Sequence, residues 1–425
     1  MATDPIRRIR HKEPDLMTMS DYYDILTELA ALPPSHDAPY LTLCLDWRTH
    51  GSEPGRRLGF EQFRREGHAA IERFWPRGVA FDSVSTDVAR IQTYLEEELD
   101  PAAHGAFIVA CAVQGVFEAV PLVLPLDTAL TLGPIPALSP LAQLVEDHVP
   151  YAVLVADQRE AVLSLVVLAA FGPALEMTSS DYPRKQHTGG WSQRRYQTRA
   201  DERVAAFARG IAEETATTLA ATGARFFILA GDEIMTSALH EAFSADVAER
   251  LAATVRLDIN ATPDEILAAT WPIAQAWERE QERADVEQVR ALALGEGRAT
   301  YGAETVLRAL ATGQAQRLIF NDDFRADGWA DYSLPVYGVG APPAEHPAGG
   351  APDALDATEL REEMIRLALL TGATIQIVHS AVPVDADTSP SERNAGDEMP
   401  RSEPARNLDE LGGVGALLRY QITPE

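Results

Sequence analysis

Cysteine, lysine and long apolar runs are scarce in this sequence. Cys44 and Cys111 are the only cysteines among 425 residues, and two cysteines build neither a disulfide framework nor a four-cysteine zinc site. Lysine occurs only at Lys12 and Lys185, so arginine supplies nearly all positive charge. No apolar run approaches the roughly 20 residues of a membrane-spanning helix, and no apolar stretch follows the basic residues 1–13, as it would in a secretory signal. These absences predict a cytoplasmic protein.

Several motifs of catalysis and nucleotide binding are also missing. The sequence has no Gly-Lys-Ser/Thr phosphate loop, no Gly-x-Ser-x-Gly nucleophile turn and no His-Glu-x-x-His zinc motif. Gly338-Val339-Gly340 lacks the third glycine and the strand-to-helix context of a dinucleotide site. We therefore expect neither nucleotide hydrolysis nor zinc chemistry, and no cofactor or metal.

Positive charge is concentrated in one short segment, residues 184–203. This segment has a net charge of +4 in a chain of net charge −28, so the remainder sums to −32. Such a spot favours one aimed contact with an anion over a general coating of nucleic acid. Its basic residues are Arg184, Lys185, Arg194, Arg195, Arg199 and Arg203.

Two glycines and a tryptophan lie within the same segment. Gly189 and Gly190 allow the backbone to approach a partner closely. Trp191 offers a ring for base stacking, and the neighbouring arginines offer phosphate contacts. The segment therefore predicts a contact with RNA, and no membrane or DNA partner.

The length favours about three domains. Alternating strand and helix patterns indicate an α/β (α+β) fold, with predicted domains at residues 1–149, 150–283 and 284–425. In the first domain, periodicity and turn residues predict helices near residues 22–29, 60–74 and 88–99, a strand at 40–46, and a hairpin of 107–113 with 116–124.

The central domain begins with two apolar strands, predicted at residues 151–156 and 161–169. An apolar-poor approach at 177–188 leads to the Gly189-Gly190 turn, and a long helix follows at 192–221. Gly223 ends that helix, residues 225–230 form a buried strand, and helical segments extend to about residue 256. The residues of the long helix that we expect to face a core are Val204, Phe207, Ala208, Ile211 and Leu219.

The last domain is predicted to start within a polar helix near Ala284. Helices are expected at residues 303–310 and 360–370, and strands at 317–320, 374–378 and 417–421. Two insertion loops interrupt it. Residues 341–357 are rich in proline, alanine and glycine, and residues 381–410 carry eight acidic and three basic residues with few large apolar side chains, which predicts a mobile loop.

The central segment resembles the middle domain of the archaeo-eukaryotic class-one peptide release factors and of their relative Pelota. In those factors two strands precede a Gly-Gly-Gln loop and a long basic helix. Here Gly189-Gly190-Trp191-Ser192-Gln193-Arg194-Arg195 occupies that place, so the sequence is similar to a divergent bacterial branch with Gly-Gly-Trp in place of Gly-Gly-Gln. Residues 301–310, 318–322 and 412–420 resemble parts of the last domain of that family, whereas the first domain matches only in outline.

The resemblance implies a fold and a role. It implies a three-domain fold with an RNase H-like central domain and an L7Ae-like last domain. It also implies a ribosomal A-site factor whose first domain lies toward the decoding centre, whose Gly-Gly-Trp loop reaches toward the peptidyl-transferase centre, and whose last domain docks a translational GTPase. In a bacterium the nearest such GTPase is elongation factor Tu. The acidic loop 381–410 is either part of that contact or only an insertion.

Two departures from the family bear on activity. Trp191 has no side-chain amide to orient a water, although its backbone N–H can still stabilise an oxyanion. The stretch comparable to the codon-reading Asn-Ile-Lys-Ser loop is residues 82–88, which contain no lysine. Both losses favour ribosome hibernation or stalled-ribosome rescue over stop-codon termination. A peptidyl-tRNA hydrolase that uses backbone chemistry is the alternative, and a module that binds free RNA is the third.

The predicted RNA-contacting residues each have a simpler structural explanation. Trp191 would otherwise pack into a core, and the arginines would form a solvated helix face. His187 beside glycine is expected to donate a hydrogen bond and not to act as a base. With the charge pattern and the resemblance, we predict an RNA-contacting site made of Arg184, Lys185, His187, Gly189, Gly190, Trp191, Gln193, Arg194, Arg195, Arg199 and Arg203, with Gly189, Gly190 and Trp191 as the candidates for any catalysis.

Overall fold

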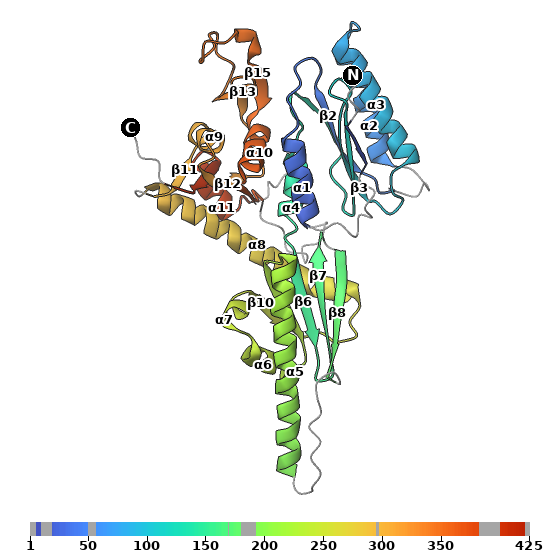
Figure 1. Cartoon of the computed structure of the whole chain (residues 1–425), viewed down its shortest axis with the longest axis vertical. Helices are drawn as coiled ribbons and strands as arrows, with labels where there is room; N and C mark the ends of the chain where they lie inside the picture. Colours follow the sequence, from blue (N-terminus) through green and yellow to red (C-terminus); the bar gives the residue numbers. More distant parts are fainter. Residues whose placement is uncertain are drawn as a thin grey trace. The chain divides into compact units, whose positions relative to one another are not determined.

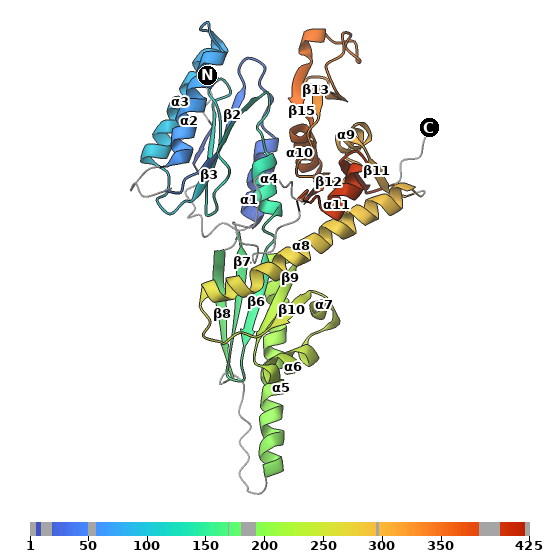
Figure 2. The ribbon, with the colours of Figure 1, turned by 180° about the vertical axis from the view of Figure 1, so that it is seen from behind.

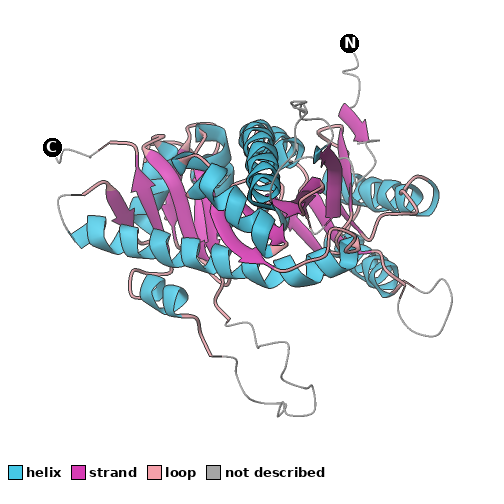
Figure 3. Cartoon of the chain, turned by 90° about the horizontal axis from the view of Figure 1, so that it is seen from below, coloured by secondary structure: helices cyan, strands magenta, loops and turns pink. Residues whose placement is uncertain are grey.

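The chain forms an α/β structure of several sheets, which confirms the predicted fold class (Figures 1 and 3). The computed structural model describes residues 6–9, 19–49, 57–168, 170–179, 193–294, 297–381 and 400–420. These residues belong to two compact units. Met1–Asp147 and Gln281–Glu425 make up one unit, and His148–Glu280 make up the other.

The first part of the larger unit contains a five-stranded sheet of order β1-β4-β3-β2-β5. The alternate residues Leu41, Leu43 and Leu45 of β2 point to one face, where they pack with Phe63 and Ile91 of the helices α2 and α3. Figure 2 shows α1 and α4 on the other side of the sheet. The elements are β1 (Ile6–Ile9), α1 (Met19–Ala30), β2 (Tyr40–Asp46), α2 (Leu58–Arg73), α3 (Val79–Glu97), β3 (Gly105–Cys111), β4 (Val116–Leu122), β5 (Ala129–Gly133) and α4 (Ser139–Glu146).

The second part of this unit contains two further sheets. A four-stranded sheet has the order β11-β17-β12-β16, and a three-stranded sheet has the order β14-β13-β15. The elements of this part are β11 (Ala299–Tyr301), α9 (Ala303–Ala311), β12 (Ala315–Asn321), β13 (Asp327–Asp331), β14 (Val336–Val339), the 3-10 helix η3 (Pro352–Ala354), β15 (Asp356–Glu359), α10 (Leu360–Thr371), β16 (Thr374–Val378), α11 (Glu403–Asp409) and β17 (Val414–Leu418).

The smaller unit is a three-layer sandwich around a sheet of order β10-β9-β6-β7-β8. Ala152 and Leu154 of β6 pack on one face with α5, whereas Tyr151 and Val153 pack on the other face with α8. This alternation follows from the two-residue repeat of a strand. The elements are β6 (Tyr151–Ala156), β7 (Glu160–Val167), β8 (Ala170–Thr178), α5 (Gln193–Thr222), β9 (Phe226–Gly231), α6 (Glu233–Ala242), α7 (Ala245–Ala248), β10 (Leu251–Val255) and α8 (Pro263–Leu294).

The structure differs from the sequence-based expectations in several segments. Residues 82–88, compared above with a codon-reading loop, lie inside helix α3, because Ser83, Val84 and Asp87 provide a face that packs inward. Residues 251–255, expected to be helical, form strand β10, and the last strand is β17 at Val414–Leu418, earlier than expected.

Both predicted insertion loops contain regular structure. Residues 341–357 include η3 and the start of β15. Within residues 381–410, Arg401 forms an isolated bridge with Ala381, and α11 packs Ala405 and Leu408 into the core. Residues 382–399 lie outside the described residues. The segment has too few apolar residues to show a helical pattern, because α11 buries only two side chains.

Candidate RNA-contacting site of the central unit

The predicted site lies between strand β8 and helix α5. Residues 180–192 lie outside the described residues, and they include Arg184, Lys185, His187, Gly189, Gly190 and Trp191. Gln193, Arg194, Arg195 and Arg199 fall in the first turns of α5, where only the backbone is described. Arg203 is exposed on α5. The RNA-contacting site therefore remains a prediction. The structure describes the elements on either side of it, strand β8 and helix α5.

The β8 end of the loop is held beside the turn between β6 and β7. Thr178 pairs with Glu160 in the sheet register. The backbone N–H of Ser179 donates to the carbonyl oxygen of Arg159 at 2.7 Å. Asp157 Oδ1 accepts from the backbone N–H of both Arg159 and Glu160, each at 2.7 Å. The chain therefore leaves strand β8 at a position that hydrogen bonds fix to the turn between β6 and β7.

The other end of the loop is the start of a long helix. Helix α5 has 30 residues, but the first described residue that packs against the core is Val204, and the first buried one is Phe207. At 1.5 Å per residue, Gln193 lies about 16 Å along the helix axis from Val204. Figure 1 shows this end of α5 extending past the ends of β6, β7 and β8. The backbone of the first turns of α5 therefore lies beyond the ends of these strands.

Charge changes along α5. The basic residues Arg194, Arg195, Arg199, Arg203 and Arg209 fall in its first seventeen residues, and the exposed acidic residues Glu213 and Glu214 follow. The free N–H groups and the dipole at a helix start also favour negative ligands. The extending end of α5 is therefore the electropositive end.

Neither cysteine is suited to nucleophilic catalysis. Cys44 and Cys111 are buried in β2 and β3. Burial raises the pKa of Cys44 to about 12 and also raises the pKa of Cys111. Because the thiolate is the reactive form, both thiols are inert packing groups.

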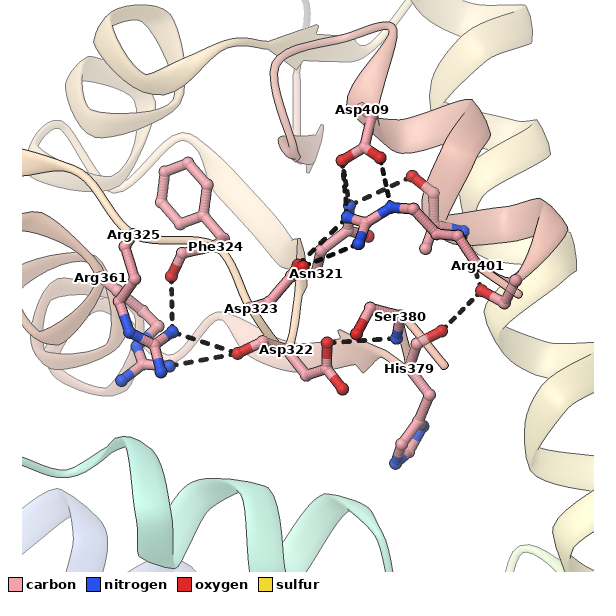
Figure 4. Close-up of polar contacts among 12 residues, drawn as sticks. Asn321, Asp322, Asp323, Phe324, Arg325, Arg361, His379, Ser380, Arg401 and Asp409 are labelled. Carbon is pink, nitrogen blue, oxygen red and sulfur yellow. Dashed lines mark hydrogen bonds and ion pairs between the residues drawn. The ribbon is translucent and has the colours of Figure 1, made fainter. Parts of the chain in front are cut away.

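The sequence did not single out a polar cluster at the ends of β12 and β16 (Figure 4). Arg401 binds both carboxylates beside it, with Nη1 at 2.7 Å from Asp323 Oδ2 and Nη2 at 2.8 Å from Asp409 Oδ1. The buried Asn321 donates from Nδ2 to Asp409 Oδ1 at 2.7 Å and to the carbonyl oxygen of Ala405 at 3.1 Å. These contacts fasten α11 to the sheet, whereas Oδ1 of Asn321 is buried without a hydrogen-bond partner among the described residues.

His379 follows β16 and lies between two carboxylates. Its Nδ1 is 2.6 Å from Glu282 Oε1 of α8, and its Nε2 is 3.1 Å from Asp147 Oδ1, at the end of α4. Hydrogen bonds to Asp147 and Glu282 raise the pKa of His379 to about 11. The imidazolium is therefore a fixed cation that joins three elements. Asn321 and Asp322 belong to residues 318–322, whose sequence resembles part of the last domain of the family. No periodic pattern marks His379 or Arg401.

Within the described ranges, no group of three or more histidine, cysteine, aspartate or glutamate side chains could hold a metal ion. Among the same residues, no helix combines the length and apolar character needed to cross a membrane.

Residues 136–275 match the family model of the bacterial archaeo-eukaryotic release factor family 10. The match confirms the predicted resemblance over the segment that contains Gly189-Gly190-Trp191 and α5. No curated protein matches the chain.

Several solved structures are similar over nearly the whole chain. An archaeal translation termination factor, aRF1, is 16% identical, with 96% of this chain and 100% of that chain covered and a TM-score of 0.25. Dom34 of S. cerevisiae, a termination-like factor described as interacting with Hbs1, is 10% identical, with 96% and 94% covered and a TM-score of 0.38. Archaeal Pelota, in a ribosome-bound model with ABCE1, is 13% identical, with 94% and 95% covered and a TM-score of 0.38. Identities and scores this low do not establish a shared function.

Proposed function

We propose that this chain is a ribosome-associated translation factor that occupies the A site and directs its Gly-Gly-Trp loop to the peptidyl-transferase centre. Its role would be ribosome hibernation or the rescue of stalled ribosomes. The observation that carries the proposal is the family match over residues 136–275, because that segment holds the loop and the basic helix together.

The geometry of α5 supports the proposal. A loop that must enter a narrow, RNA-lined site needs a support that reaches away from its domain. The start of α5 lies about 16 Å along the helix axis from Val204, the first described residue that packs against the core, and the residues between them are rich in arginine. Arginine contacts to phosphate hold a protein in position without reading sequence, which suits a site lined by ribosomal RNA.

The chemistry of the tip favours occupation over hydrolysis. The indole of Trp191 offers stacking on a base, worth about 1–3 kcal/mol per base, but no amide to orient a water. The stretch 82–88 lies in helix α3 with Asp87 and Ser83 buried, so it offers no codon-reading loop. A factor that lacks both the side-chain amide and the codon-reading loop fits ribosome hibernation or the rescue of stalled ribosomes.

Ribosome binding tests the proposal directly. We expect the combined change Arg194→Glu, Arg195→Glu and Arg199→Glu to abolish co-sedimentation of the full chain with ribosomes at physiological salt. The matched control is Arg256→Glu, Arg298→Glu and Arg308→Glu, which changes the charge equally at exposed positions outside α5. Equal binding by both triple variants would show that the three α5 arginines are only a solvated surface.

A single-turnover assay separates the proposed role from its alternatives. Ribosomes carrying labelled peptidyl-tRNA are mixed with the native chain, and we expect no rapid peptide release. Rapid release that is lost in Gly190→Pro would establish the peptidyl-tRNA hydrolase. A chain that stays in the light fractions of sedimented extract, under both starvation and stress, would instead favour the module that binds free RNA.

The predicted GTPase partner remains part of the proposal. We expect residues 284–425 to include the docking surface for elongation factor Tu. A pull-down with the GTP-bound and GDP-bound forms tests this, and equal absence of binding to both forms would remove elongation factor Tu from the proposal.

A further inference from the structure

The backbone passes twice between the two compact units. The smaller unit, His148–Glu280, is an insertion in the larger one, so the chain leaves the larger unit after Asp147 and returns to it at Gln281. The first crossing follows directly on α4, whose C-cap is Asp147. The second crossing lies inside α8, which continues unbroken through it (Figure 2). Motion of one unit relative to another is the usual behaviour unless contacts restrict it, so the contacts at these two points are of interest.

One side chain of the larger unit binds at both crossings. His379, which follows β16, places Nδ1 2.6 Å from Glu282 Oε1 and Nε2 3.1 Å from Asp147 Oδ1. Its backbone N–H also donates to Glu282 Oε2 at 3.1 Å. Asp147 is the last residue before the first crossing, and Glu282 is the second residue of the larger unit after the other. We call these three residues the His379 clamp.

The backbone that carries the imidazole is fixed to the sheet of the last part of the chain. The carbonyl oxygen of His379 accepts from the hydroxyl of Ser402 at 2.6 Å, and the backbone N–H of Ser380 donates to Asp322 Oδ1 at 3.1 Å (Figure 4). Strand β16, which precedes His379, pairs with β12 along its whole length. The imidazole therefore holds the two crossings to a hydrogen-bonded support and not to a free loop.

Helix α8 changes its packing partners at the clamp. Its first half packs on the core of the smaller unit, where the rings of Trp277 and Phe226 stack with centroids 4.4 Å apart. Its second half packs Val286 and Val289 into the core of the larger unit. The four residues 278–281 between these contacts are all polar, and Glu282 is the first buried residue after them. The clamp therefore holds α8 where its apolar core contacts are interrupted.

The clamp makes one contact more than local stability requires. One carboxylate neutralises an imidazolium, and the buried Glu282 already meets both the ring and the backbone of His379. The other ring nitrogen reaches Asp147, a partly exposed carboxylate at the end of a different helix. Hydrogen bonds to Asp147 and Glu282 raise the pKa of His379 to about 11, so the clamp keeps its charge at physiological pH. Its effect is to tie the two crossings to each other through one ring.

We propose that the His379 clamp is a latch that restricts how the smaller unit can be oriented relative to the larger one. While the latch is closed, neither crossing can swing without breaking an ion pair. Once it opens, the backbone can bend at Asp147–His148 and within residues 278–281, because hinges are short segments that core packing does not hold. The inference goes beyond the proposed function, since it concerns the chain by itself, in the absence of a ribosome.

Distances between pairs of nitroxide labels on the full chain, measured by pulsed electron paramagnetic resonance, test the proposal. The native cysteines are buried, so the labels attach to introduced cysteines at exposed helical positions. Glu214→Cys on α5 with Glu97→Cys on α3 reports between the units, and Gln288→Cys on α8 with Glu304→Cys on α9 reports within the larger unit. We expect His379→Gln roughly to double the width of the first distance distribution and to leave the second unchanged.

Two further variants make the test specific. Asp147→Asn weakens the hold on one crossing only, and it should broaden the distribution between the units by less than His379→Gln does. Arg401→Gln breaks ion pairs at the same end of the sheet without touching either crossing, so it is the matched control and should leave both distributions narrow. Should calorimetry show that His379→Gln does not fold, Asp147→Asn decides the question by the same measurement.

Three outcomes would overturn the latch. They are a native distribution between the units as broad as that of His379→Gln, equal broadening of both label pairs, which is a general loosening of the fold, and equal broadening by Arg401→Gln. None of these measurements involves a ribosome. Failure of the latch therefore leaves the proposed function intact, and loss of the proposed function in the sedimentation experiment leaves the latch intact.

Discussion

The carboxylate of Glu362 caps the helix that begins at Ser139. Glu362 lies on α10, 223 residues later in the chain, and it accepts hydrogen bonds from the backbone N–H of Ser139 at 2.9 Å and from its hydroxyl. It also accepts from the backbone N–H of Leu138 at 2.6 Å. Helix α4 has no side-chain cap of its own. A residue of the last part of the chain therefore satisfies the first N–H groups of a helix in the first part.

We predict that Glu362→Ala destabilises the larger unit by about 3 kcal/mol, because it leaves buried N–H groups without partners. Both Glu362 and Ser139 are buried. Differential scanning calorimetry of the full chain measures the loss as a lower transition temperature. Glu304→Ala, which removes an exposed i,i+4 pair with Arg308, is the control and should change the stability by less than about 0.5 kcal/mol. Equal effects of the two changes would contradict the capping role.

Asp87 should make the stability depend on pH in an unusual direction. Burial raises its pKa from 3.8 to about 6, although the backbone N–H of Ala112 donates to it at 2.9 Å. Because the folded chain holds this proton more tightly than the unfolded chain, its contribution to stability is greatest below the usual pKa and declines as pH rises toward 6. The difference amounts to about 3 kcal/mol.

The variant Asp87→Asn should lose this dependence. We expect the difference in unfolding free energy between the native chain and the variant to shift by about 2–3 kcal/mol in favour of the variant from pH 4 to pH 7. Urea unfolding at several pH values measures it. Asp82→Asn, an exposed change on the same helix, is the control. A constant difference across that range would show that the pKa of Asp87 is the same in the folded and unfolded chains.

His379 should behave as a permanent cation. Its two carboxylate partners raise its pKa to about 11, so it stabilises the fold fully below the usual pKa of 6.5 and loses that contribution only as pH rises toward 11. The ring is partly exposed, and after allowance for screening by solvent we expect His379→Gln to cost about 2 kcal/mol at neutral pH. His68→Gln, at an exposed i,i+4 pair with Glu72, should cost little.

NMR of the histidine ring protons checks this assignment. The resonance that disappears in His379→Gln should not titrate between pH 5 and pH 9 in the native chain. A midpoint near the ordinary histidine value of about 6.5 would contradict the double ion pair with Asp147 and Glu282.

Arg401 should not be replaceable by lysine. Its guanidinium spans Asp323 and Asp409, and one ammonium cannot make the same paired contacts. We predict that Arg401→Lys destabilises the chain by about 1 kcal/mol, since the three side chains are partly exposed. Thermal unfolding measures the loss. Arg256→Lys, at an exposed pair with Glu233, is the control, and an equal loss there would mean that the fork geometry of Arg401 is irrelevant.

Local patterns predicted the elements that have strong periodicity. The strands predicted at residues 40–46 and 374–378 are β2 and β16, and each of them buries nearly all of its residues. The apolar spacing of Phe207, Ala208, Ile211 and Leu219 identified the long helix α5, and Gly223, with φ of 70°, ends it as expected.

Sequence patterns did not predict short strands or buried polar residues whose partners lie far away in the chain. Strand β13 pairs with both β14 and β15, but its short, polar partner β15 looks like loop sequence. Asp331 and His346 are both buried and paired at 2.9 Å, so polar residues occupy core positions that composition alone assigns to the surface. Burial of a polar side chain depends on its partner, and sequence spacing does not identify that partner.

The amino-acid sequence by itself determined the α/β class, the long basic helix, and the concentration of arginine around Gly189-Gly190-Trp191 within an acidic chain. Those features arise from local composition and periodicity. Only the tertiary structure decided that Glu362 caps α4 and that His379 joins Asp147 to Glu282. The reason is physical. Hydrogen bonds, ion pairs and exposure depend on which residues meet in space, and chain folding brings together residues that no local pattern connects.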